Sequence, residues 1–284
     1  MHLFVNGTSV ASGVGTGGEK FKGLGDGDIT TSWAHFLANM LNCDRLWNHS
    51  LPSKPMSFTI ADTIGFCEQY WQKYGTYDNL FAVIEWLMPQ AHGKWGTVSS
   101  TTQPYQHCDI FPVVVSWPDT PTVFETMYLS RPRDVDYLSN RAIYEPVSIQ
   151  HIDYHCVITH EQQRDRYYNK QYNLSNRLAE SAREIQFLKN WLTTRNIRFV
   201  MFWAYGVGRI AGMRKLVDRA VLSVIEQDGT FIPIKDFAGG DAAYYSQNPV
   251  RGHPDIHGQK YIADYLYNYI AQHRLLAPST LIHT

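Results

Sequence analysis

Two apolar runs of strand length constrain the fold of this chain more than any other feature. Residues 80–84 read Leu-Phe-Ala-Val-Ile and residues 198–203 read Arg-Phe-Val-Met-Phe-Trp, without the alternation of a half-exposed strand. Such runs are typical of strands that are buried on both faces of a parallel sheet. Because parallel strands need crossover connections, these runs predict an α/β fold with helices packed on the sheet.

The rest of the regular pattern fits this architecture. Apolar residues recur at helical spacing in four segments, 33–41, 58–74, 178–192 and 261–273, and short strands are expected at 3–6 and 45–48. This order of strands and helices predicts a three-layer α/β/α fold with a mainly parallel sheet.

The middle of the chain, between about 90 and 172, lacks this regularity. It contains turn signals such as Ser-Trp-Pro-Asp at 116–119 and Arg-Pro-Arg-Asp at 131–134. The α/β pattern resumes after it. We therefore interpret 90–172 as a large insertion within a single domain that covers residues 1–284.

Composition excludes several classes of function. Lys and Arg number 25 against 26 Asp and Glu, a formal net charge of −1, so we expect no nucleic-acid partner. No apolar stretch approaches the roughly 20 residues of a membrane span, and the first residues lack the pattern of a signal peptide. The four cysteines show no paired spacing. These features predict a cytoplasmic protein without membrane attachment.

Two polar residues at opposite ends of the sequence are candidates for chemistry. Ser9 follows the first predicted strand, at the carboxyl edge where open α/β sheets place reactive groups. His253 precedes the last predicted helix, from where it reaches across the sheet to Ser9. Each residue also has a simpler interpretation, because loop serines and helix-entry histidines commonly bond only to their own backbone.

Together these segments resemble the SGNH/GDSL hydrolase superfamily. Gly7-Thr8-Ser9, a helix that starts at Trp33, and His253-Pro254-Asp255-x-x-Gly258 carry the resemblance, which is greatest to a divergent branch found in tailed bacteriophages. It covers roughly the first 90 and the last 110 residues. The resemblance implies that Ser9 is the nucleophile and His253 the general base, and that no metal or cofactor takes part.

The resemblance also assigns the groups that stabilise the oxyanion and orient the histidine. The second sequence block falls at 48–53, where Ser53 or Lys54 stands at the place of the glycine whose N–H helps to hold the oxyanion. Asn48 is a further candidate for holding the oxyanion or orienting the site. The third block, 84–89, holds no asparagine where the family has a further donor.

The family's triad aspartate falls at Val250, which leaves Asp255, Asp241 or a backbone carbonyl to orient His253. We expect Asp255 to cap the last helix, and Asp241 or a carbonyl to accept from His253. Such a site predicts a slow esterase whose activity rises as the pH passes through the pKa of the histidine.

Two function classes follow. One is an esterase that removes acyl groups, such as O-acetyl, from a small molecule or a glycan. The other is a non-catalytic structural or binding protein, such as a phage virion component, that keeps the same fold. The partners of the chain are either further copies of itself, in a homo-oligomer, or other virion proteins. A protein of the second class is expected in the virion and not in the cytoplasm.

Two further motifs do not fit their usual context. Residues 13–18 match GxGxxG, but the next predicted helix starts only beyond Asp28, so we expect a loop over Ser9 and no nucleotide site. On a helix, the possible metal ligands His151, His155, Cys156 and His160 could meet at i, i+4 spacing, but the residues between them favour a strand. That conformation holds the side chains too far apart for a metal site.

Overall fold

The structure is a computed structural model. It describes residues 1–14, 16, 29–51, 54, 56–86, 91–93, 108–116, 124–132, 136–138, 145–147, 174–204, 228–233 and 253–276.

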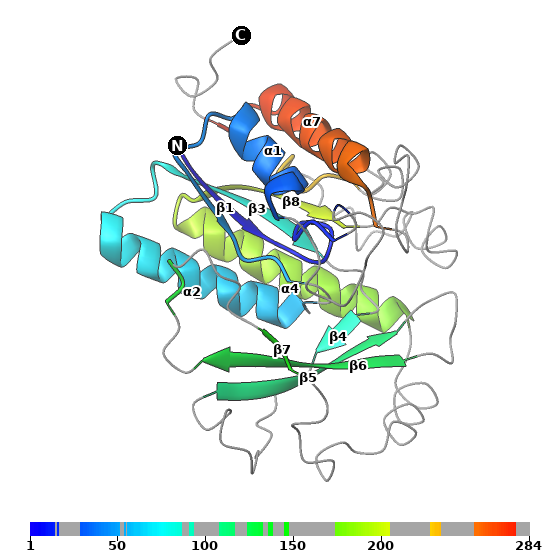
Figure 1. Ribbon diagram of the computed structural model, residues 1–284. Coiled ribbons are helices and arrows are strands. Elements are labelled where there is room, and N and C mark those ends of the chain that lie inside the picture. Colours follow the sequence, from blue (N-terminus) through cyan, green and yellow to red (C-terminus); the bar gives the residue numbers. More distant parts are fainter. Residues whose placement is uncertain are drawn as a thin grey trace.

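Four parallel strands form the main sheet (Figure 1). They are β1 (His2–Asn6), β2 (Arg45–Asn48), β3 (Leu80–Trp86) and β8 (Arg198–Trp203), in the spatial order β2-β1-β3-β8. Beyond β8, a parallel bridge between Met201 and Phe231 continues the sheet by one more position. The order is that of a doubly wound sheet, as the sequence predicts.

Helices cover both faces of this sheet and complete the three layers (Figure 1). On one face α1 (Trp33–Met40) packs against α7 (Ile256–Gln272), and a 3₁₀ turn at Ile29–Thr31 leads into α1. On the other face lie α2 (Met56–Tyr74) and α4 (Leu174–Thr194). The three-layer α/β/α prediction is confirmed.

Large aromatic side chains fill the two interfaces between sheet and helices. Among the residues that the structure describes, the side chains of four tryptophans are fully buried, namely Trp33, Trp47, Trp86 and Trp203. Phe4 on β1 stacks on Phe66 of α2 with ring centroids 4.0 Å apart. Each such side chain contributes roughly 1.5–3 kcal/mol through burial, so this core fixes the carboxyl edge of the sheet in place.

The segment between β3 and α4 contains a second sheet, which the sequence analysis did not predict. Its strands are β4 (Ala91–Gly93), β5 (Cys108–Ser116), β6 (Phe124–Pro132) and β7 (Glu145–Val147), all antiparallel in the order β4-β5-β6-β7. Figure 1 shows this sheet on the side of α2 and α4 that faces away from the main sheet. The turn signal expected at 131–134 is partly wrong, because residues 131–132 belong to β6.

A short segment after β6 packs on α2. The backbone N–H of Tyr137 donates to Gln69 Oε1 at 2.7 Å, and Trp47 Nε1 donates to the carbonyl of Leu138 at 2.9 Å. A Cβ at Gly65 would lie only 2.3 Å from the Tyr137 ring, so this close approach requires a glycine in the helix. The contacts tie the middle segment to the α/β layers. That residues 90–172 are an insertion within one domain stays a prediction.

In the part of the chain that the structure describes, no helix combines the length and the apolar content needed to cross a bilayer.

Candidate active site

The loop after β1 carries Ser9 at the carboxyl edge of the sheet. Between Gly7 and Val14 the chain folds into consecutive turns, in which Ser12 N donates to Thr8 O and Val14 N donates to Ser9 O, both at 3.0 Å. Ser9 itself is 8% exposed. The loop is therefore compact, and it places the Ser9 hydroxyl at a defined position above β1.

His253 meets Ser9 from the other end of the chain. Its Nε2 lies 2.8 Å from Ser9 Oγ, across 244 positions of sequence. The histidine is partly buried and stands three residues before α7. The proximity that the sequence predicts is confirmed, and a neutral imidazole at this distance is placed to accept the proton of the hydroxyl.

Asp255 caps the helix that follows His253. Its Oδ1 accepts from the backbone N–H groups of His257 at 3.0 Å and Gly258 at 3.1 Å, and its backbone is extended, as an N-cap requires. The expected capping role is confirmed. The same cap places the start of α7 at Ile256, as expected for a helix that Asp255 caps; the apolar periodicity of the helix begins later, at 261.

Gln259 joins the two halves of the site. Its Nε2 donates to Val10 O in the Ser9 loop at 3.0 Å, and its Oε1 accepts from Trp33 N at the start of α1 at 2.9 Å. The side chain is fully buried. Since Gln259 lies on α7, these two bonds hold the helix behind His253 against the loop that carries Ser9.

A buried carboxylate lies beneath the Ser9 loop. Glu85 on β3 accepts from Thr8 N at 2.9 Å, from the Thr8 hydroxyl and from Ala11 N at 3.3 Å, all through Oε1. Its Oε2 accepts from Trp33 Nε1 at 2.9 Å. Burial raises the pKa of Glu85, and the hydrogen bonds from Thr8, Trp33 and Ala11 oppose that shift. Because all four partners donate, the arrangement suits the ionised carboxylate.

Gly7 allows this carboxylate to approach the loop. A Cβ at position 7 would lie 2.7 Å from Glu85 Cβ and 3.0 Å from Ala11 Cβ. The structure shows that the requirement for glycine here is one of space.

We expect Glu85→Gln to lower turnover without removing Ser9 or His253. An amide presents a donor where the carboxylate has only acceptors, so at least one buried N–H loses its partner, at a cost of about 1–3 kcal/mol. Loosening of the Ser9 loop should lower kcat by up to about 100-fold, as small misplacements of reacting groups do. Stopped-flow ester hydrolysis and urea unfolding measure the two effects.

Trp33→Phe is the control variant, because it removes one hydrogen bond to Glu85 and keeps the Glu85 side chain itself. A Glu85→Gln protein with full activity and full stability would contradict the role of Glu85 in holding the Ser9 loop.

Asn48 braces the Ser9 loop from the end of β2. Its Nδ2 donates to Ala11 O at 2.9 Å, and its Oδ1 accepts from Ser50 N at 3.0 Å. These contacts give Asn48 a structural function, and its part in holding an oxyanion stays a prediction. Ser53 and Asp241, the other two candidates for this site, lie outside the described residues.

A buried ion pair between Lys54 and Asp62 lies next to the end of β1. Lys54 Nζ donates to Asn6 Oδ1 at 2.8 Å, to His49 O at 3.0 Å and to the Asp62 carboxylate. Both charged side chains are fully buried. Burial lowers the pKa of Lys54, and the adjacent Asp62 opposes that shift. Since Asn6 directly precedes Gly7, this cluster anchors the start of the Ser9 loop.

Sequence reasoning missed Glu85, Asp62 and Gln259. A signal existed for Glu85, because it is the single charged residue in the otherwise apolar strand Leu-Phe-Ala-Val-Ile-Glu-Trp. A charge in a strand that is buried on both faces requires polar partners. The partners come from distant segments, so the sequence pattern does not name them.

The remaining motifs add no second candidate for chemistry. Of the glycine-rich segment 13–18, the structure describes residues 13, 14 and 16, and the histidines between 151 and 160 lie outside the described residues. Within the described residues, no group of three or more His, Cys, Asp or Glu side chains is arranged to hold a metal ion.

Comparison with known proteins identifies no family for this chain. No family model and no curated protein matches the chain. Among solved structures, the chain is similar to one described as a carbohydrate esterase whose active site has divergent catalytic and non-catalytic binding functions. The TM-score is 0.44 and the identity 11%, over 95% of this chain and 64% of the other. This chain thus spans less than two thirds of that protein's length, and a similarity at this level carries no argument about function.

Proposed function

We propose that this chain is a serine hydrolase of the SGNH type, similar to the divergent bacteriophage branch, which removes acyl groups from a glycan. The hydrogen bond of 2.8 Å between Ser9 Oγ and His253 Nε2 carries the proposal. It joins a loop at the carboxyl end of β1 to the residue ahead of α7, which is where the sequence resemblance puts a nucleophile and its base.

The reaction takes two steps on these residues. His253 Nε2 accepts the proton of Ser9 as Oγ attacks the ester carbonyl carbon, and the same proton then passes to the departing alcohol oxygen. Ser9 is left as an acyl ester. A water molecule then attacks that ester while His253 accepts its proton, which returns to Ser9 Oγ when the carboxylic acid leaves.

The Glu85 carboxylate and Asn48 fix the loop during this cycle. Both contact the backbone between Thr8 and Ala11, on either side of the nucleophile. A loop that is already fixed needs little reorganisation when Oγ attacks, which favours turnover. Orientation of His253 by Asp241 or by a backbone carbonyl, and oxyanion contacts from Asn48 or Ser53, belong to the same proposal.

Hydrolysis of p-nitrophenyl acetate tests the proposal. The purified chain should cleave this ester, and Ser9→Ala should lower turnover by at least about a thousandfold, since the acyl-enzyme cannot form. A fluorophosphonate probe should label the wild type and not Ser9→Ala. Ser12→Ala, which removes a hydroxyl three residues away, should keep the label. Release of acetate from an O-acetylated polysaccharide then tests the glycan assignment.

The alternative is a non-catalytic structural or binding protein, including a virion component. The absence of asparagine from residues 84–89 and the valine at position 250 favour it. A folded wild type that neither cleaves the ester nor reacts with the probe would support this alternative and overturn the hydrolase.

A further inference from the structure

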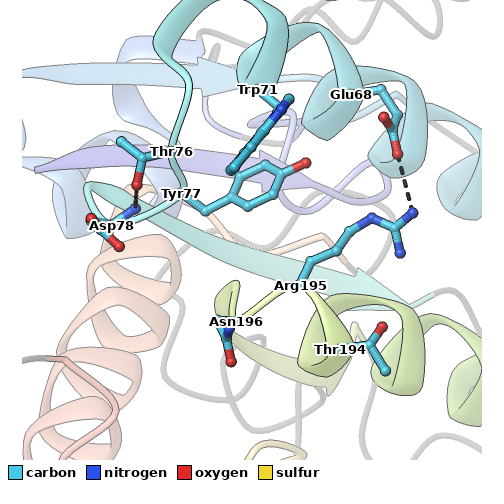
Figure 2. Close-up of a pocket in the computed structure, with 8 residues that line it drawn as sticks. All are labelled: Glu68, Trp71, Thr76, Tyr77, Asp78, Thr194, Arg195 and Asn196. Carbon is cyan, nitrogen blue, oxygen red and sulfur yellow. Dashed lines mark hydrogen bonds and ion pairs between the residues drawn. The ribbon is translucent and has the colours of Figure 1, made fainter.

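A cavity lies at the edge of the main sheet opposite to Ser9. It has a volume of about 460 Å³ and opens beside the turns that lead into β3 and β8 (Figure 2). Helices α2 and α4 both end at this level. The volume falls within the range of roughly 300–1,000 Å³ that is usual for sites of small ligands.

Two aromatic rings form the apolar part of this cavity. Trp71, near the end of α2, is 48% exposed, and Tyr77 is buried beside it, with ring centroids 5.1 Å apart and planes inclined by 40°. Figure 2 shows both rings between the Thr76–Asp78 turn and the Glu68–Arg195 pair. An exposed tryptophan beside a cavity offers a large apolar surface to a ligand, and its side chain loses little conformational entropy on binding.

Charged and amide groups surround these rings. Glu68 and Arg195 form an exposed ion pair at 3.4 Å, and Asp78 and Asn196 line the cavity beside them. Arg198 does not line the cavity, but its guanidinium donates to the backbone carbonyl of Asp78, so two cations and two carboxylates lie in or next to the lining. The positive and negative charges around the cavity therefore balance, and its lining offers both hydrogen-bond donors and hydrogen-bond acceptors.

The backbone of both turns is fixed. Gly75 and Asn196 have positive φ angles of 70° and 54°, and each ends a helix in the left-handed conformation. Gly75 N donates to Trp71 O at 2.8 Å, and Asn196 N donates to Thr193 O at 3.0 Å. The lining groups thus stand on helix ends that are closed by hydrogen bonds.

We propose that this cavity binds a neutral saccharide. Sugar hydroxyl groups both donate and accept, which suits a lining of carboxylates, an amide and a guanidinium. The apolar face of a sugar ring packs on an exposed indole, and balanced charges favour a neutral ligand over an anion or a cation. The inference does not rest on the hydrolase. If both hold, the chain has a non-catalytic glycan site on the edge of the sheet opposite to the reacting serine.

Titration with three neutral tetrasaccharides tests this site. Tryptophan fluorescence and saturation-transfer NMR are recorded for wild type and Ser9→Ala with maltotetraose, cellotetraose and chitotetraose. We expect saturable binding of at least one, equal in the two proteins, and at least about tenfold weaker binding in Trp71→Ala. Asn196→Gly, which keeps the positive φ and removes the amide, should also weaken binding. Phe187→Ala removes another exposed aromatic side chain, on α4, and should leave binding unchanged.

Any one of the following results would overturn the inference. They are no saturation by any of the three sugars up to roughly 20 mM, unchanged affinity in a folded Trp71→Ala protein, and saturable binding of tetramethylammonium that the sugars do not displace. Loss of binding in Ser9→Ala alone would place the sugar at the serine and also overturn it. Failure of ester hydrolysis leaves each of these readouts intact, so the two proposals fail separately.

Discussion

Replacing His253 by alanine abolishes ester cleavage and leaves the chain folded. The imidazole is the base that lies within hydrogen-bond reach of Ser9 Oγ, at 2.8 Å, and without it the hydroxyl keeps its proton. Loss of a triad member costs several powers of ten in the serine-protease template, and we expect at least about a thousandfold here. Steady-state hydrolysis and circular dichroism together separate lost chemistry from lost structure.

Asp255→Asn is the matched variant, two residues away. The structure shows Asp255 capping α7, so the substitution should cost about 1 kcal/mol of unfolding free energy and keep turnover within about tenfold of the wild type. A fully folded Asp255→Asn protein without activity would mean that Asp255 belongs to the catalytic machinery. Orientation of the imidazole by Asp241 or a carbonyl would then be wrong.

Lys54→Met destabilises the chain by about 3–5 kcal/mol, because it leaves the fully buried Asp62 charge without its partner. It also removes the donor to Asn6 Oδ1 at the end of β1. The double variant Lys54→Met/Asp62→Leu should recover most of the loss, since no unpaired charge remains. Glu68→Gln is the comparison, because it breaks the exposed pair between Glu68 and Arg195. It should lower the free energy of unfolding by less than about 1 kcal/mol. Urea unfolding measures all three, and a single variant as stable as the double would contradict this account.

The same lysine gives a pH dependence of known sign. Burial lowers the pKa of Lys54 from its ordinary value of 10.5, so in the alkaline range below that value the unfolded chain binds a proton that the folded chain releases more easily. The free energy of unfolding therefore gains a rising contribution with pH in that window. The contribution should be absent from Lys54→Met/Asp62→Leu, and a difference between the two proteins that falls with pH would refute the sign.

The main sheet was predictable because its strands are marked locally. β2 and β8 begin and end at the residues that the sequence predicts, 45–48 and 198–203. A strand that is buried on both faces, such as β3 or β8, appears as a nearly continuous apolar run whatever its partner strand is. The proximity of Ser9 and His253 was predictable for a similar reason. Carboxyl ends of parallel strands meet at one edge, and the resemblance supplied the two residue types.

The second sheet and the buried polar groups were not predictable in this way. β5 carries Pro112 in its interior and β6 ends on Pro132, and each proline reads locally as a turn or an edge. Their pairing depends on the partner strand. Glu85 likewise takes its meaning from Thr8 and Trp33, which are 77 and 52 positions away. Contacts between residues so far apart in the sequence depend on tertiary packing, which the local sequence pattern does not reveal.

The hydrogen bond between Ser9 and His253 sets an order of events during synthesis. A ribosome completes β1, the Ser9 loop and the whole of α2 before it reaches position 253, and Gln259, which ties α7 to that loop, follows six residues later. A nascent chain therefore displays the serine with neither its base nor the helix behind it. Under the proposed function, hydrolysis starts only once residues 253–272 have left the ribosome and docked against α1, so partly made chains stay inactive toward acylated glycans around them.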